Sequence, residues 1–307
     1  MSHHPTKCRL SALGIWPQTS SSLALVYLAF SLGLFSDQRA YSWWIKGHGI
    51  LTQAAVSALP EDVPMFFRAA AKELAYLAGD PDRWKNPETP ALRTSESPEH
   101  YIDLEDYNNQ PLPANRYEAI ALLQRLKRRP ERAGLLPWAI QEHYERLTCA
   151  FADLRRQPEE AANRTKCIVY AGILAHYAQD AAMPLHTTRD YDGRRSPDGK
   201  WLQKGIHAKI DGFPETHNIT AEEIARHLQA KTQPDIWLYI MQVIQESHKQ
   251  VDRCYELDAD GAFDKPTEDS RAFILARCRV AAQFTLDLWY NAWKRSEKLP
   301  PPFPGAP

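Results

Sequence analysis

Three side chains of the kinds that bind transition metals lie close together in one segment, which reads His176-x3-Asp180-x5-His186. His176 and Asp180 are four residues apart in an otherwise apolar run, so on a helix both project from one face. Burying an imidazole beside a carboxylate costs several kcal/mol unless a bonded partner or a bound cation offsets it. Pro184 ends such a helix, and the turn brings His186 back toward the same end. The segment therefore predicts three ligands of a metal site.

A second His/Asp pair with the same spacing, His207 and Asp211, follows a loop that contains glycine and proline. Either pair alone is also explained by a core histidine hydrogen-bonded to a nearby acid, because one pair at this spacing arises easily by chance. The two pairs together with His186 favour a metal centre. His100, which precedes Tyr-Ile-Asp, and His48, which follows a glycine, are ordinary polar residues when taken singly.

Taken together, these segments resemble the zinc-dependent phospholipases C, which share their fold with the single-strand-specific zinc nucleases. The resemblance runs from Trp43 to about Pro214. The family has a Trp at its mature N-terminus that binds zinc through its amine and carbonyl, and Trp43 matches it. The family also has an Asp that follows Ala or Pro, and Asp82 matches that Asp, with Asp80 as a rival. The separation of eighteen residues between Asp82 and His100 is longer than the family pattern.

The resemblance implies a centre of three zinc ions. The ligands of the first are Asp82, His100, His176 and Asp180, those of the second are His186, His207 and Asp211, and those of the third are Trp43, His48 and a bridging Asp180. The ligand types fit zinc independently of the resemblance, because they are imidazoles and carboxylates whose incomplete shells leave positions for water and substrate. The implied reaction is hydrolysis of a phosphate ester by activated water, and Asp82 is the expected catalytic residue that orients or deprotonates this water.

Two local features point to different branches of the family. The segment from Gly205 to Phe213 is similar to the second-zinc segment of the phospholipases, and Ile210 stands where the nucleases usually carry Trp. The spacing from Trp43 to His48 is instead similar to that of the nucleases. We therefore expect a phospholipase C-type phosphodiesterase that cleaves phospholipids and contacts membrane surfaces transiently. A zinc-dependent nuclease on single-stranded nucleic acid is the first alternative, and a non-catalytic, zinc-binding secreted protein is the second.

The elements that must position these residues are helices, because apolar residues recur with helical periodicity over most of the chain. The expected helical runs are Leu51–Leu59, Met65–Leu77, Tyr117–Lys127, Trp138–Leu154, Ala161–Ala182, Ile236–Tyr255 and Ala272–Trp293. Alternating strand patterns are scarce, and the 307 residues contain no visible internal repeat. The sequence predicts an all-α, single-domain, multi-helix bundle of the phospholipase C and zinc nuclease type at residues 43–296, followed by a Pro-rich flexible tail at 297–307.

The first 42 residues have the pattern of a secretory signal peptide. Lys7 and Arg9 precede an apolar run from Leu23 to Phe35, which is too short for a comfortable membrane span. Small residues then precede Trp43, where we expect cleavage; an uncleaved anchor or a buried N-terminal helix is the alternative. Cleavage predicts a secreted or periplasmic enzyme. It would be inactive before export, because the amine of Trp43 exists only after cleavage and must be deprotonated to bind metal.

Charge and cysteine content argue against two other kinds of site. The net charge of −1 gives no electrostatic reason to expect tight binding of nucleic acid. We expect the protein to be a monomer. The cysteines that follow residue 42 are Cys149, Cys167, Cys254 and Cys278. None of them is in a Cys-x-x-Cys arrangement, so a thiolate metal site is not expected. Buried thiols and disulfides in any of three pairings both remain open.

Overall fold

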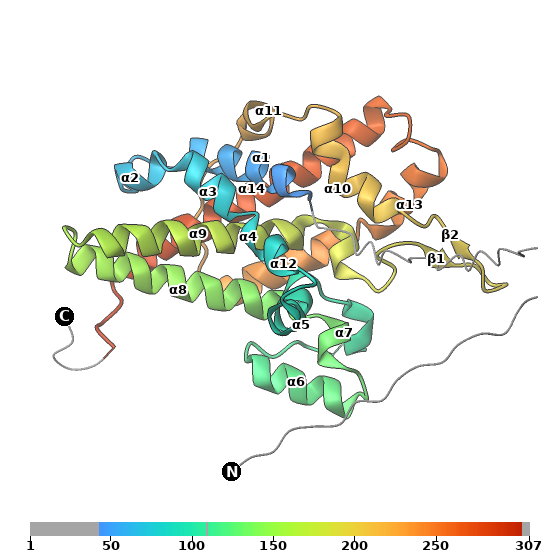
Figure 1. Cartoon of the computed structure of the whole chain (residues 1–307), viewed down its shortest axis with the longest axis horizontal. Coiled ribbons are helices and arrows are strands. Elements are labelled where there is room, and N and C mark those ends of the chain that lie inside the picture. The colour runs from blue at the N-terminus through green and yellow to red at the C-terminus, as the bar shows by residue number, and fades with distance from the viewer. Residues whose placement is uncertain (1–42, 109, 303–307) are drawn as a thin grey trace, which may run out of the picture. The chain divides into compact units, whose positions relative to one another are not determined.

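Helices make up most of the described chain, which in this computed structural model comprises residues 43–302 except residue 109 (Figure 1). In chain order the elements are α1 (Ile45–Ser57), α2 (Met65–Arg68), α3 (Ala71–Leu77), α4 (Asp80–Trp84), α5 (Pro90–Glu96), the 3-10 helices η1 (Ser97–His100) and η2 (Leu104–Tyr107), α6 (Arg116–Arg125), α7 (Pro130–Ala133), α8 (Leu136–Arg156), α9 (Ala161–Ala182), the 3-10 helix η3 (Pro184–Thr187), β1 (Arg194–Arg195), β2 (Trp201–Leu202), α10 (Ile206–Thr216), α11 (Ala221–Ala225), α12 (Ile236–His248), α13 (Val251–Ala259) and α14 (Glu268–Ser296). The two strands form a short antiparallel hairpin. The prediction of an all-α, multi-helix bundle is confirmed.

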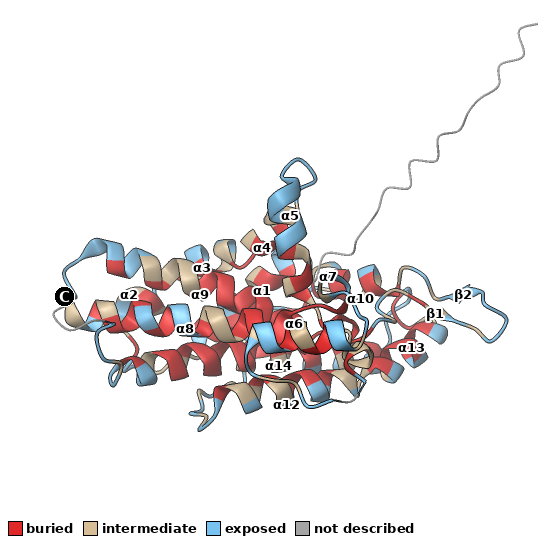
Figure 2. Cartoon of the chain, turned by 90° about the horizontal axis from the view of Figure 1, so that it is seen from below, coloured by how far each residue is buried: buried red, intermediate tan, exposed pale blue. Residues whose placement is uncertain are grey.

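Helix α9 lies at the centre of the bundle, where α8 runs beside it and α14, α1 and α3 also pack on it (Figures 1 and 2). Its last twelve residues, Ala171 to Ala182, are all buried, and many of them are small. Small side chains let neighbouring helices come close: a Cβ at Gly172 would lie only 2.4 Å from Cβ of Leu77 on α3. The segment from 171 to 182 is therefore a rigid support for the polar side chains it carries.

Two apolar cores meet along α9. Ala175, Ala178 and Ala181 belong to the larger core, formed mainly with α8, α12 and the second half of α14. Ala182 and Met183 belong to a second core that includes residues of α1, α10, α13 and the first half of α14. The end of α9 thus lies at the junction of the two cores, where polar groups from several elements can converge.

The helix boundaries show what the periodicity missed. α9 spans Ala161–Ala182, the predicted range, but two predicted runs each form two helices. The run 65–77 is interrupted at Ala70, whose N–H donates to the carbonyl of Phe67, and the run 236–255 at Gln250, whose N–H donates to Ser247. Bonds of this i to i−3 kind tighten the last turn and let the chain change direction without proline or glycine, so the sequence carries no breaker signal there.

Several predictions about the chain ends fall partly or wholly on residues that are not described. The predicted signal peptide, residues 1–42, lies outside the described residues, as do residues 303–307 of the predicted tail. α14 ends at Ser296, one residue before the tail was predicted to begin. Within the described part of the chain, none of the helices combines the length and the hydrophobicity that a transmembrane span requires.

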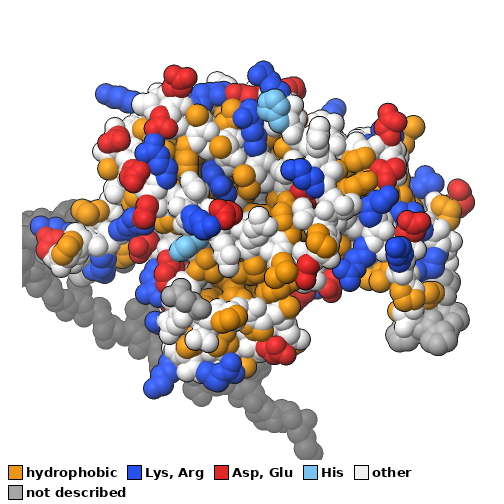
Figure 3. Space-filling model, turned by 180° about the vertical axis from the view of Figure 1, so that it is seen from behind, with side chains coloured by type: hydrophobic (Ala, Val, Ile, Leu, Met, Phe, Trp, Pro, Cys, Tyr) orange, Lys and Arg blue, Asp and Glu red, His pale blue; other side chains and the backbone are white. Residues whose placement is uncertain are grey.

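The surface mixes charges of both signs. On the face seen in Figure 3, Lys and Arg side chains alternate with Asp and Glu, and apolar side chains gather in its lower part. The described residues drawn on that face show no continuous basic stripe. All four described cysteines are free thiols, with Cys149 exposed and the other three buried.

Candidate metal centre

Six elements bring the predicted side-chain ligands together. α9 carries His176 and Asp180 on one face, one turn apart. The other ligands come from α1 (His48), α4 (Asp82), η1 (His100), η3 (His186) and α10 (His207 and Asp211). All eight side chains are at most 5 % exposed. They fall into three groups whose ligand atoms lie within 4.8 Å of one another, here called the Asp180, Asp82 and Asp211 clusters.

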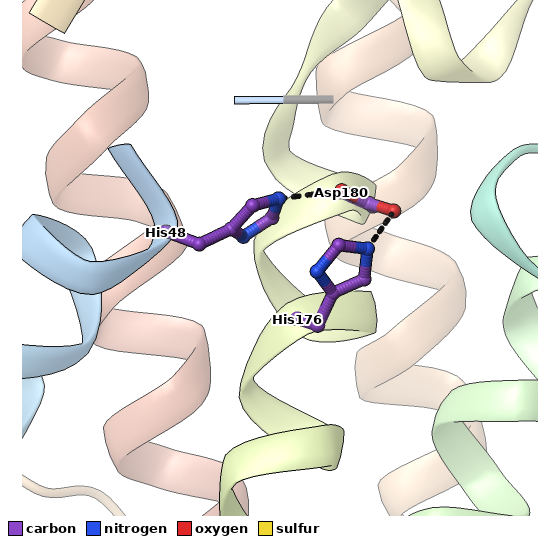
Figure 4. A group of neighbouring side chains, drawn as sticks. All are labelled: His48, His176 and Asp180. Atoms are coloured by element: carbon purple, nitrogen blue, oxygen red, sulfur yellow. Dashed lines mark ion pairs between the residues drawn. The ribbon is translucent and has the colours of Figure 1, made fainter. Parts of the chain in front are cut away.

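The Asp180 cluster consists of His48, His176 and Asp180, and in Figure 4 the two imidazoles from α1 and α9 point toward the two oxygens of one carboxylate. His48 Nε2 lies 3.5 Å from Asp180 Oδ1, and His176 Nε2 lies 3.3 Å from Asp180 Oδ2. The rings are stacked with centroids 4.0 Å apart. The expected third zinc ligand set, Trp43, His48 and Asp180, therefore also has His176 beside it.

The Asp82 cluster consists of Asp82, His100 and His176, so it shares His176 with the Asp180 cluster. His100 Nδ1 lies 2.9 Å from His176 Nε2, and both nitrogens lie 3.9 Å from Asp82 Oδ1. His100 Nδ1 is also 3.1 Å from Asp180 Oδ2. These contacts join the four residues expected to hold the first zinc ion.

The Asp211 cluster consists of His186, His207 and Asp211. The Nε2 atoms of the two histidines are 2.9 Å apart, and His207 Nε2 lies 3.1 Å from Asp211 Oδ2. His186 Nδ1 lies 3.9 Å from Asp180 Oδ2. Pro184 opens the 3-10 helix that follows α9, so the expected turn of His186 back toward the end of α9 is present.

Trp43 and Asp80 complete the predicted set. Trp43 is fully buried, and its indole N–H donates to the carbonyl oxygen of Gln179, 3.2 Å away, which places it beside Asp180. Its backbone lies near Asp211, because the Cβ that Gly47 lacks would be 3.4 Å from Trp43 Cβ and 4.0 Å from the Asp211 carbonyl oxygen. Asp80, the rival of Asp82, instead pairs with Arg83 at 2.6 Å and is in none of the three clusters.

Hydrogen bonds on the outer side of the rings fix which nitrogen faces the centre. Nδ1 of His48, His176 and His186 lies 2.6 to 2.7 Å from an oxygen of Gln179, Ala78 and His100, respectively. Amide oxygens only accept, so each Nδ1 carries its proton and each Nε2 presents a lone pair inward. The amide of Gln179 is itself oriented, because its Nε2 donates to Thr52 Oγ1 at 2.9 Å. This arrangement of outer partners is typical of metal-binding histidines.

Bound cations fit this set of donors. Buried lone pairs that face one another at 2.9 Å, as between His100 Nδ1 and His176 Nε2, repel unless a proton or a metal ion lies between them. Both side-chain oxygens of Asp211 are buried, and His207 Nε2, 3.1 Å from Oδ2, is the one ionisable nitrogen in contact with them among the described residues. Burial raises the pKa of Asp211 well above its usual value, so its ionised form requires a positive charge nearby. Imidazole nitrogens and carboxylate oxygens without thiolates are ligands that suit zinc.

One cationic residue of the site escaped the sequence reasoning. Lys85 Nζ lies 2.6 Å from Asp82 Oδ1, and its side chain is 15 % exposed. Burial alone would raise the pKa of Asp82, but Lys85 and, to a lesser degree, His176 lower it to about 2. The spacing of three residues on a short helix was the available signal for this pair. Gln179, the partner of His48, was also missed, and its signal was a polar residue next to Asp180 on an otherwise apolar helix.

Comparison with known proteins adds little to this description. No protein-family model matches the chain, and no curated protein matches it. Solved structures similar to it include alpha-toxin from an avian strain of Clostridium perfringens, at 14 % identity and a TM-score of 0.42. The match covers 84 % of this chain and 65 % of the toxin chain. Alpha toxin from Clostridium absonum has 12 % identity and a TM-score of 0.43, over 82 % of this chain and 64 % of that one. The chain thus spans just under two thirds of the length of these structures.

Proposed function

We propose that this chain is a secreted, zinc-dependent hydrolase of phosphate esters, with a phospholipase C-type reaction on phospholipids as its main activity. The observation that carries the proposal is a group of three buried His/Asp clusters around Asp180, which belongs to one cluster and lies 3.1 Å from His100 and 3.9 Å from His186 of the other two. Burial of so many imidazoles and carboxylates costs free energy that bound cations would offset, and neighbouring metal sites with open positions are suited to holding a phosphate. The resemblance of the sequence motifs to the zinc-dependent phospholipases C supports the choice of zinc and of substrate.

The residues divide into those that hold metal and those that act on substrate and water. Zinc bound at the clusters supplies Lewis acidity toward phosphate oxygens and toward water. The ligands are the nine predicted residues, with His176 available to two clusters. Although burial raises the pKa of Asp82, Lys85 and His176 lower it, so the carboxylate stays ionised and can orient a water molecule by accepting a hydrogen bond. Lys85 presents an ammonium group beside it that can pair with a phosphate oxygen.

The N-terminus has a specific part in this proposal. Cleavage before Trp43 creates an amine next to the Asp211 and Asp180 clusters, which supplies a further ligand. The same cleavage accounts for a secreted or periplasmic location. The proposal thus links export to the completion of the site.

The test uses the chain that begins at Trp43, its zinc content, and its activity with and without a chelator. Phosphatidylcholine, single-stranded DNA and a simple phosphodiester are the three substrates, and we expect chelator-sensitive cleavage of phosphatidylcholine. Preference for the DNA indicates the nuclease instead. Zinc without cleavage of any of the three indicates a binding protein.

Variants show whether the clusters are responsible. We expect His176→Ala and His207→Ala each to lose zinc and activity. The matched control is His227→Ala, because this exposed histidine belongs to none of the clusters. If His176→Ala and His207→Ala keep the zinc content of the unchanged chain, these histidines are packing residues and the proposed centre is wrong.

A further inference from the structure

The outer nitrogen of His100 faces a charged group, in contrast to those of the other oriented histidines. His48, His176 and His186 each donate to a neutral amide oxygen. His100 Nε2 instead lies 3.5 Å from Oε1 of Glu96, one helical turn before it in the chain. His100 is 2 % exposed, so water is largely excluded from this contact.

Glu96 is buried although the helix that carries it, α5, is mostly exposed. α5 stands out from the rest of the chain and is mostly exposed (Figure 2), and Glu96 is its single buried residue, at 8 % exposure. An acidic side chain at the end of an exposed helix could turn to solvent at no cost, whereas burial of its charge costs free energy unless it is paired. The carboxylate is therefore held inward by a partner.

The partners of Glu96 belong to the metal centre. Tyr177, the residue after His176 on α9, donates its hydroxyl hydrogen to Glu96 Oε1. The Tyr177 ring packs edge-on against His100, with centroids 5.6 Å apart, and stacks on His143 at 5.1 Å. The carboxylate is thus fixed between the element that carries His100 and the element that carries His176.

We propose that Glu96 is a positioning residue that fixes His100 for metal binding, with Tyr177 holding Glu96 in place. The carboxylate 3.5 Å from Nε2 favours the tautomer of His100 that carries its proton on Nε2, and in this tautomer the lone pair of Nδ1 faces the Asp82 cluster. An anionic acceptor also makes this imidazole a stronger metal ligand than the three that donate to neutral oxygens. The inference rests on the proposed metal-dependent function. It adds that Glu96 strengthens the binding of one of the three ions, the one held by His100.

The experiment measures zinc affinity by competition with a chelator, so that it does not depend on hydrolysis. Glu96→Gln keeps the shape and removes the charge, and Glu96→Leu removes the acceptor. We expect the dissociation constant of one zinc ion to rise about tenfold in the first variant and up to about 100-fold in the second, with the other ions unaffected. Excess zinc should restore the full stoichiometry, which a general loss of folding would not allow.

The matched control is Glu99→Gln. Glu99 lies on η1, the 3-10 helix that carries His100, and pairs with Arg116 at 2.5 Å. Wild-type zinc affinity in both Glu96 variants, or an equal loss in Glu99→Gln, overturns the inference. If Glu96→Leu does not fold, Tyr177→Phe is measured beside Glu96→Gln. It removes only the hydroxyl group that holds Glu96 and should weaken the binding of the same zinc ion. A wild-type chain that binds no zinc refutes the proposed function itself, which is a separate result.

Discussion

Asp180→Asn is the substitution that bears most directly on the centre, because it keeps the side-chain shape and removes the charge at the point where the clusters meet. The oxygens of Asp180 lie 3.5 Å from His48 Nε2, 3.3 Å from His176 Nε2 and 3.1 Å from His100 Nδ1. A neutral amide oxygen is a weaker metal ligand than a carboxylate oxygen, and the amide nitrogen is no ligand at all. The variant should therefore weaken the binding of every ion that is held through Asp180.

The size of the effect follows from the positions of these atoms. Loss of an outer partner of a ligand costs about 10- to 100-fold in metal affinity, so loss of a shared ligand costs at least about 100-fold. That factor corresponds to about 2.7 kcal/mol of zinc-dependent stabilisation. For a chain of this size, about 2 to 4 °C of melting temperature per kcal/mol gives a deficit of about 5 to 10 °C.

The assay is thermal unfolding of the chain from Trp43, measured with excess zinc and with chelator at pH 8. The zinc-induced rise in melting temperature is compared, so any effect of the substitution on the metal-free chain cancels. Asp153→Asn is the control, because Asp153 is a surface acid that pairs with Lys166 and Arg156. An equal zinc-induced rise in Asp180→Asn and in the unchanged chain refutes the assignment of Asp180 as a shared ligand.

Three further predictions concern the neighbouring groups. Lys85→Met should leave the zinc content unchanged and lower kcat/KM about 10- to 100-fold, because a charged hydrogen bond to phosphate is worth about 1.5 to 3 kcal/mol. If kcat/KM is unchanged, Lys85 only holds Asp82 in place. One extra residue before Trp43 should reduce the bound zinc by one ion and lower the phosphodiesterase rate, and elemental analysis with unchanged zinc excludes the amine as a ligand. Asp103 is half-buried, and this partial burial together with the nearby Glu105 raises its pKa to about 8, so the folded chain keeps a proton that the unfolded chain loses. The contribution of Asp103 to stability should fall from about pH 4 to pH 8, by at most about 1.4 kcal/mol per pH unit, and Asp103→Asn should remove this contribution in urea unfolding of the metal-free chain. Parallel pH profiles of the two chains contradict the raised pKa.

Local sequence was sufficient wherever neighbouring residues on one element set the geometry. α9 begins at Ala161 and ends at Ala182 as predicted, because its apolar period is long and Pro184 cannot continue the helix. The shared face of His176 and Asp180 follows from a spacing of four residues. The turn of His186 toward the end of α9 follows from the proline.

Other parts of the site depended on contacts that the local sequence does not encode. Asp80 and Asp82 are two positions apart, about 200° around a helix, so one faces the centre and the other Arg83, and only the packing of α4 decides which. The inward burial of Glu96 likewise arises from Tyr177, on a helix distant in the sequence. Periodicity indicates which face of a helix is apolar, but it does not indicate which element lies against that face.

The sequence by itself determined the helical class, the bounds of α9 and the residue types able to bind zinc, because helical period and side-chain chemistry are local properties. Only the tertiary structure decided that Asp82 rather than Asp80 joins the centre, that His176 belongs to two clusters, and that Lys85 enters the site. These groupings arise where two apolar cores meet at the end of α9. Their physical origin is the packing of elements far apart in the chain, which sets the distances between the side chains that they carry.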